Sequence, residues 1–225
     1  MSTLALALLK PRVSEACWRW LESERHNIRA GAGARHLGRA YTLAARRFGR
    51  EPLNLTDAER TLVAAADPDA TFAQWDMTDV GRLALLHAVF EGAQATADAS
   101  ALALETFAAA DAREQQSWLR GISLLPHDDR YVPVAVDACR TNILPLFESI
   151  ACENPFPVRR FPDLNFNQMV LKAVFNNIAL SRIVGLSRRL NAELSRMAAA
   201  YISERRAAGR TVPDDISLVL QEPVS

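Results

Sequence analysis

The amino-acid sequence predicts an all-α fold, and three observations support this prediction. Alanine and leucine are abundant while glycine and runs of β-branched residues are sparse, so the composition favours helices. Apolar residues recur at helical spacing along most of the chain, which is typical of helices with one buried face. Short connections separate these segments. They favour stacked antiparallel helical hairpins, arranged either like HEAT or armadillo repeats or as an irregular bundle.

In the first half of the chain, apolar periodicity predicts the helices and local signals predict their ends. The small residues 30–33 separate the first two long helices, and Gly49 suits a C-terminal cap. Thr56 and Glu59 match the capping box, in which each side chain bonds the backbone N–H of the other residue. Helices are expected at residues 4–9, 13–28, 35–48, 56–67, 76–90, 98–110 and 113–124.

In the second half, prolines and a glycine mark the element ends. Pro133 and Pro145 fit first helical turns, and Gly209 suits the end of the last helix. The loop 154–157, Asn-Pro-Phe-Pro, is expected to be extended because residues before proline avoid the α region. Helices are expected at residues 131–139, 143–151, 163–178 and 182–208. No linker-like stretch interrupts them, so we expect residues 1–225 to form a single domain.

The composition excludes several classes of protein. An apolar share of 49% with 23% charged residues argues against disorder. The three cysteines, Cys17, Cys139 and Cys152, form no CxxC pair, which argues against a disulfide framework and favours a reducing compartment. The apolar residues 4–9 have no basic segment before them, and no apolar run approaches the ~18 residues of a membrane span. We therefore expect a cytoplasmic protein.

The zero net charge hides a segregation along the chain. Residues 1–50 hold 10 Lys+Arg and 3 Asp+Glu, residues 51–150 hold 6 and 16, and residues 151–225 hold 10 and 7. The simpler interpretation is that the basic ends dock on the acidic middle, or that the helices merely have charged outer faces. The alternative is a basic patch for an anionic ligand or for peripheral contact with a membrane. No nucleic-acid-binding motif occurs, so no nucleic acid partner is expected.

No familiar catalytic or metal-binding motif is present. The patterns GxGxxG, GxxxxGK[ST], HExxH and GxSxG are all missing. His87 lies on an apolar helical face, which predicts a packed, hydrogen-bonded role. His127 precedes two aspartates in a loop, a pattern more typical of a helix N-cap than of a metal site. We therefore expect no metal and no cofactor.

One helix carries an unusual polar stripe. Asn165, Gln168, Lys172 and Asn176 share one narrow face, and most of the remaining circumference is apolar. Amides pair donors with acceptors, which suits them to orient a polar ligand or neighbouring backbone. The stripe either belongs to a packing network or lines a polar pocket between helices. Asn167 lies within the apolar arc and needs a buried partner.

Lys172 is one of only two lysines in the chain, the other being Lys10. The ordinary interpretation is a lysine at a helix edge whose stem is buried and whose amine reaches water. A partly buried lysine alternatively supplies a point charge to an anion, or a nucleophilic amine.

Other candidate side chains lie outside the stripe. Asp137 and Arg140 are three residues apart on a predicted helix, where they form either a surface ion pair or a buried arginine that faces a carboxylate or phosphate. Trp118 and Phe166 are candidate stacking surfaces for a ligand ring, and Asn154 lies on the loop that leads to the stripe helix.

Several segments of the C-terminal half together resemble one protein family. They are Asn154–Pro157, Phe161, residues 167–173 (NQMVLKA), Phe175, Gly185, Leu186, Arg189, Asn191, Leu194, Met197, Glu204, Arg205, Gly209 and Arg210. In sequence and order they are similar to the EboA family, whereas the N-terminal half matches only as a helical segment. The chain departs from the family pattern at Phe166, where tryptophan is frequent, and in residues 214–217, which lack an expected tryptophan.

The resemblance implies a protein encoded in a bacterial gene cluster for traffic of a secondary metabolite or its precursor. It maps the family's motif residues onto Asn154, Pro155, Asn167, Gln168 and Lys172. Our leading hypothesis is a non-enzymatic protein that binds a small polar or aromatic metabolite near the stripe, or that docks other proteins of the cluster. The alternatives are an enzyme with Lys172 or His127 as base or nucleophile, and a purely structural helical scaffold.

Overall fold

The computed structural model describes residues 2–92, 97–126 and 128–220. Within these ranges all regular elements are helical apart from one isolated bridge between Pro52 and Asp76, which confirms the all-α prediction. The α-helices are α1 (Ser2–Leu9), α2 (Glu15–Arg29), α3 (Gly33–Phe48), α4 (Asp57–Ala66), α5 (Met77–Glu91), α6 (Ala97–Ala109), α7 (Ala112–Gly121), α8 (Val132–Ala138), α9 (Leu144–Ala151), α10 (Phe156–Arg160), α11 (Asp163–Phe175) and α12 (Ala192–Ala207). Short 3₁₀ helices are η1 (Lys10–Arg12), η2 (Ile122–Leu124), η3 (Asp128–Tyr131), η4 (Leu180–Arg182), η5 (Leu186–Arg189) and η6 (Asp214–Val219).

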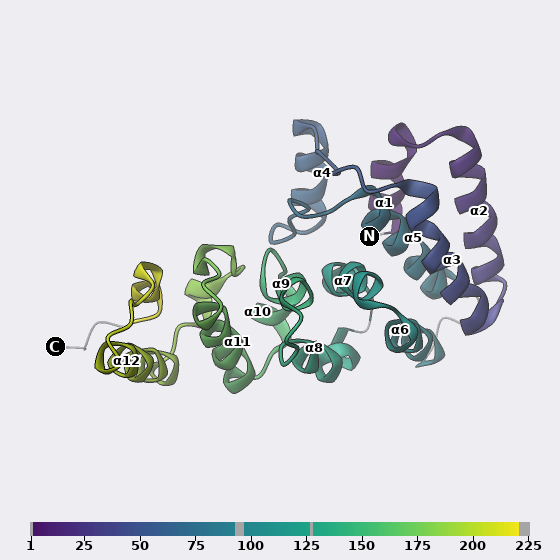
Figure 1. Ribbon diagram of the computed structural model, residues 1–225. Helices are drawn as coiled ribbons and strands as arrows, with labels where there is room; N and C mark the ends of the chain where they lie inside the picture. The colour runs from purple at the N-terminus through teal and green to yellow at the C-terminus, as the bar shows by residue number, and fades with distance from the viewer. Residues whose placement is uncertain (1, 93–96, 127, 221–225) are drawn as a thin grey trace.

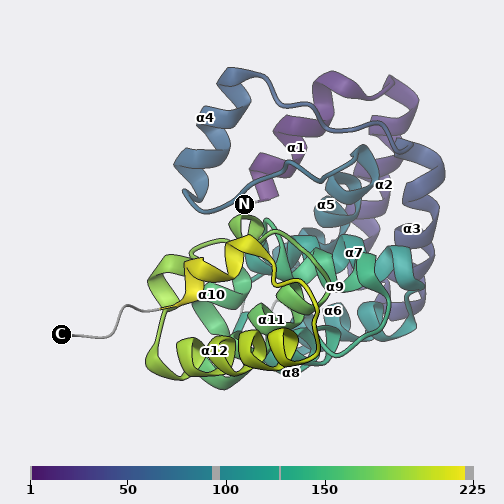
Figure 2. The same cartoon turned by 60° about the vertical axis from the view of Figure 1, so that its left-hand side comes forward.

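The helices form a bundle at one end that continues into a row. At the N-terminal end, α1, α2 and α3 pack around α5, and α4 lies at the edge of this bundle, where it packs on α1 (Figure 1). From there α7, α9, α11 and α12 follow one another, each packed on the next, toward the C-terminal end of the molecule. The rotated view in Figure 2 shows the same succession, with α12 in front of the row. None of the helices in the described part of the chain is long and apolar enough to cross a membrane.

The central helix α5 is buried on all sides. Each of its residues from Met77 to Val89 is buried, because α1, α2, α3, α6 and α7 surround it. Its N-terminus is satisfied by a capping box between Asp76 and Asp79. At Gly81, an added Cβ would lie 2.2 Å from the ring of Phe48, so only glycine permits this approach of α3 to α5.

Ion pairs between distant segments confirm that the basic ends dock on the acidic middle. Near the N-terminus, Arg12 binds Glu59 and Arg25 binds Glu91. From the C-terminal part, Arg159 binds both Asp67 and Asp69, and further pairs join Arg188 to Asp69 and Arg182 to Glu148. The charge segregation in the sequence therefore corresponds to contacts across the fold.

Two element predictions in the C-terminal half are wrong. The expected helix 182–208 is divided into η4, η5 and α12, because Gly185 adopts a left-handed φ of 66° and Asn191 caps the start of α12. The loop 154–157 is not extended throughout. Pro155 is α-helical and α10 begins at Phe156, with a proline tolerated in the first turn, where backbone N–H groups need no helical acceptor.

The buried His87 makes stability sensitive to pH, and we expect a His87→Gln variant to reduce this sensitivity. Burial lowers the pKa of His87 from 6.5 to about 4, although its bond to the Leu124 carbonyl acts in the opposite direction. The unfolded chain therefore binds the proton first. Stability conferred by the neutral ring is lost as pH falls from 6.5 to about 4.

Urea unfolding between pH 7.5 and 4 measures this effect. The wild type should lose up to about 3 kcal/mol more across this range than His87→Gln, whose amide keeps a donor for the Leu124 carbonyl. The exposed His26 provides the control, as His26→Gln should leave the wild-type slope unchanged. Equal slopes for all three proteins would contradict the assignment.

Candidate functional site

A cavity of about 270 Å³ lies between α11 and the C-terminal end of α8; we name it the stripe cavity. Four of the residues predicted from the sequence line it together: Arg140, Asn165, Gln168 and Lys172. The remaining lining residues are Val136, Cys139, Phe161 and Met169. Three of the four side chains in the polar stripe, Asn165, Gln168 and Lys172, therefore border this cavity.

Lys172 joins α11 to the end of α8. Its Nζ donates hydrogen bonds to the carbonyls of Cys139 at 2.7 Å and Thr141 at 2.6 Å, which follow the last turn of α8. Cations are favoured at this position because the carbonyls at a helix C-terminus carry partial negative charge. The ammonium also lies 5.1 Å from the ring centre of Phe147. Lys172 is therefore held by protein groups at the edge of the cavity.

The other polar side chains at the stripe cavity have unused hydrogen-bonding groups. Asn165 and Gln168 make no side-chain hydrogen bond to another described residue, and each presents both a donor and an acceptor. Arg140 binds Asp137 at 2.7 Å, but both side chains are about 70% exposed, so the pair is a surface ion pair and not a buried one. Only one guanidinium nitrogen of Arg140 is used in this bond.

The charge of the stripe cavity is positive. Arg140 and Lys172 line it, no carboxylate does, and Asp137 offsets one of the two cations from outside. The thiol of Cys139 stays neutral because burial raises its pKa to about 12. Such a surface favours a small ligand with an anionic group and further polar atoms.

Three predicted site residues form structural contacts elsewhere. The amides of Asn167 and Asn191 exchange two hydrogen bonds of 3.1 Å, and Asn191 also caps α12, so Asn167 links α11 to α12. Asn176 bonds back to the Lys172 carbonyl of its own helix at 2.9 Å. The ring of Phe166 is fully buried, with the Arg189 guanidinium 4.8 Å away.

Trp118 is also fully buried, and its indole N–H donates to the Ala103 carbonyl at 3.0 Å. Together with the burial of Phe166, this means that neither predicted stacking residue presents a face to a ligand. Both are large aromatic side chains at positions where helices meet, which is the ordinary role of such residues in helical proteins. The expectation of a stacking role for Trp118 and Phe166 is therefore replaced by a packing role.

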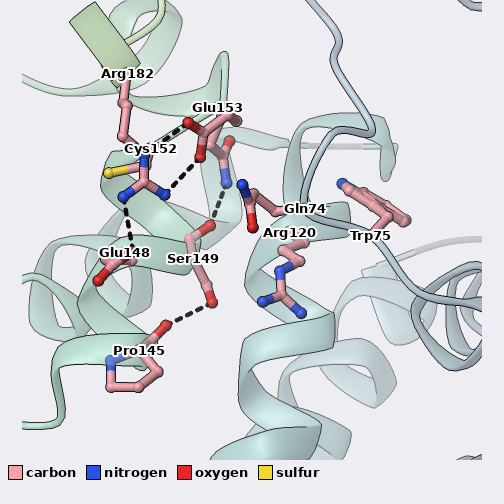
Figure 3. A pocket seen from close by; sticks show the side chains of 10 residues that line it. Gln74, Trp75, Arg120, Pro145, Glu148, Ser149, Cys152, Glu153 and Arg182 are labelled. Carbon is pink, nitrogen blue, oxygen red and sulfur yellow. Dashed lines mark hydrogen bonds and ion pairs between the residues drawn. The ribbon is translucent and has the colours of Figure 1, made fainter. Parts of the chain in front are cut away.

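A second cavity, of about 180 Å³, lies at the junction of α7, α9 and η4 (Figure 3); we name it the central cavity. Its lining residues are Gln74, Trp75, Arg120, Pro145, Glu148, Ser149, Cys152, Glu153, Asn154 and Arg182. Arg182 holds one wall together by binding Glu153 with two nitrogens and Glu148 with a third, at 2.8 to 3.0 Å. Hydrogen bonds with these two carboxylates raise the pKa of Arg182 above its usual value.

The predicted site residue Asn154 lies at the central cavity, with its side chain already engaged. Its Nδ2 donates to the carbonyls of Leu119 at 2.8 Å and Ser149 at 2.9 Å, and its Oδ1 accepts from the Phe156 N–H at 3.0 Å. Asn154 therefore ties the ends of α7 and α9 to the start of α10. It holds the cavity wall in place, and both its amide N–H groups and its amide oxygen are already used in hydrogen bonds to the protein.

Sequence reasoning missed the rest of the central cavity. Trp75 and Gln74 precede α5, Arg120 lies on α7, and Glu148 and Arg182 lie on either side of α10 and α11. No spacing rule relates positions so far apart in the chain. Within the described residues, no group of three or more His, Cys, Asp or Glu side chains is arranged to hold a metal ion. His127 lies outside the described residues.

Comparison with known proteins gives one match, which extends over both cavities. Residues 1–221 match the family model described as "Metabolite traffic protein EboA". The chain belongs to the EboA family. No curated protein and no solved structure matches the chain. The EboA match includes the N-terminal bundle, for which the sequence had shown only a helical pattern.

We expect Asn154→Ala to destabilise the fold because it removes three buried hydrogen bonds and leaves the Ser149 carbonyl and the Phe156 N–H without these partners, while the Leu119 carbonyl keeps its bond from the Ile122 N–H. The expected loss is about 3 kcal/mol in the free energy of unfolding, measured by urea denaturation. Asn142→Ala is the matched control on the nearby exposed surface, with an expected change below about 0.5 kcal/mol. A loss below ~1 kcal/mol for Asn154→Ala would contradict a structural role.

We expect Lys172 to react with an amine reagent more slowly than Lys10. The two carbonyls that accept from Lys172 must be released before its amine attacks, whereas Lys10 is exposed. Limited acetylation at pH 7, read by peptide mass spectrometry, should show a difference of at least about tenfold. A faster reaction at Lys172 would contradict this structural role and support a nucleophilic one.

Proposed function

We propose that this protein binds a small anionic metabolite in the stripe cavity and holds it during metabolite traffic. The observation that carries the proposal is that Arg140, Asn165 and Gln168, each with unused hydrogen-bonding groups, border one positively charged cavity with Lys172. The family description supports a metabolite as the partner.

The dimensions of the cavity restrict the ligand. At about 270 Å³ it lies near the lower end of the range of small-molecule sites, ~300 to 1,000 Å³. Phe161 and Met169 supply buried apolar wall, so a ring or short hydrocarbon fits beside the polar groups. The proposed ligand is therefore a small polar or aromatic compound with one acidic group, which lies beside Arg140 and Lys172.

The proposal places the protein in the cytoplasm of a bacterium, in the traffic of a secondary metabolite or its precursor. The three cysteines are all unpaired, which suits a reducing compartment. Binding without catalysis is favoured because Lys172, the residue that an enzymatic mechanism would use as its nucleophile, is hydrogen-bonded to two carbonyls. Any contact with a membrane is peripheral in this proposal.

Native mass spectrometry of the protein purified from its producing organism tests the proposal. The wild type should retain a small molecule, and Asn165→Leu combined with Gln168→Leu should lower its occupancy by about tenfold or more, as two ligand hydrogen bonds are lost. These substitutions leave the bonds of Lys172 intact. Gln116→Leu, the same chemical change on α7 and outside both cavities, is the control.

Two results would contradict the proposal. Equal occupancy in the double variant and the wild type would place the ligand elsewhere. A wild-type protein without a small molecule that instead carries another protein of the pathway would favour a docking role, in which the polar stripe contributes only to packing.

A further inference from the structure

The wall of the central cavity carries a hydrogen-bond donor that no described protein group uses. Trp75 is 5% exposed, and its indole N–H has no hydrogen-bond acceptor among the described residues. In Figure 3 the nitrogen is the end of the indole ring nearest to Gln74 and Arg120. The ring is buried while its N–H stays open to the cavity, where it is available to an acceptor atom of a ligand.

Arg120 provides further donors on the same side of the cavity. Its Nη1 binds the buried Asp79 at 2.9 Å, and no other acceptor in the described part of the chain binds the guanidinium. Asp79 is itself fixed by the Ser117 hydroxyl at 2.6 Å and by the capping box of α5. Arg120 is thus held rigidly with N–H groups to spare. Together with Trp75 it suits the two oxygens of a carboxylate.

The opposite wall of the central cavity carries an excess of negative charge. Glu148 and Glu153 share Arg182, and one oxygen of Glu148 accepts no hydrogen bond from another described residue. With Asp79 behind Arg120, three carboxylates face two guanidiniums, for a formal charge of −1. A simple anion is therefore disfavoured, whereas a ligand with a positive group near Glu148 is favoured.

We propose that the central cavity binds a small zwitterion of the amino-acid class. Its carboxylate accepts from the Trp75 indole and from Arg120, and its ammonium group donates to Glu148. The volume of about 180 Å³ fits this class, because a cavity of ~150 Å³ accommodates a molecule the size of benzene. This site is separate from the stripe cavity and takes a ligand of different charge.

Isothermal titration calorimetry on the full chain tests the class of ligand. Glycine, L-alanine, L-serine, L-valine and L-proline are the probes. The tightest binder is then compared with its amide, which lacks the carboxylate, and its N-acetyl form, which lacks the ammonium. Both derivatives should bind at least about tenfold more weakly, since each loses a charge-assisted contact. If none of the five binds at 10 mM, or if either derivative binds as tightly, the proposal is wrong.

Two variants assign the binding to this cavity. Trp75→Phe removes the indole N–H and keeps an aromatic ring, while Glu148→Gln keeps an acceptor for Arg182 and removes the charge. Each should weaken the amino acid by about tenfold or more. Because Trp75 is buried, thermal unfolding of Trp75→Phe and the wild type shows whether the substitution changes stability. Glu148 is partly exposed, so Glu148→Gln tests binding at a position where the fold is less sensitive.

Gln168→Leu in the stripe cavity is the control and should leave amino-acid binding unchanged. If Gln168→Leu weakens binding while Glu148→Gln does not, the amino acid lies in the stripe cavity and the central site is disproved. The two proposals thus fail separately, as retention of a metabolite depends on Asn165 and Gln168, and amino-acid binding depends on Trp75 and Glu148.

Discussion

The burial of α5 on every side is the constraint on which the rest of the structure depends. A helix without a solvent-facing side must satisfy its polar groups internally. Each neutral polar group that is buried without a partner lowers the free energy of unfolding by about 1 to 3 kcal/mol. Arg82 does so with the Tyr41 carbonyl and the Ser117 hydroxyl, and Asp79 with Ser117 and Arg120. These bonds fix α3 and α7 against α5. Since α7 packs on α9, they also set the position of the central cavity.

In the C-terminal row of helices, the amine of Lys172 connects α11 to the end of α8 in the same way. A lysine combines a long stem with a compact group of three donors, so one side chain crosses from α11 and reaches two successive carbonyl positions at the end of α8. Arg189 fixes the other end of α11 through the Asp163 carboxylate and through the Phe161 carbonyl just before the helix. With both ends of α11 held, Asn165 and Gln168 remain free to border the stripe cavity.

The sequence predicted those features whose causes are local. The helix pattern and the capping box at Thr56 and Glu59 place α2 to α9 within a few residues of their observed ends. The stripe at Asn165, Gln168 and Lys172 was recognisable because amides are unusual on an otherwise apolar helix. Whether such amides meet a cavity or a partner depends on the neighbouring helix. The amide of Asn167 bonds the amide of Asn191, just before α12, and the periodicity of a sequence cannot predict such a contact.

The two cavities differ in charge for reasons that lie outside their own linings. Asp79 neutralises Arg120 from the α5 side and leaves the central cavity negative, whereas Asp137 neutralises only one of the two cations at the stripe cavity. The segment between α8 and α9 connects them, with the Cys139 carbonyl bound to Lys172 at one end and Pro145 in the central cavity at the other. Lys172 thus ties the lining of the stripe cavity to the segment that leads into α9. The two cavities therefore differ in charge but share one structural element.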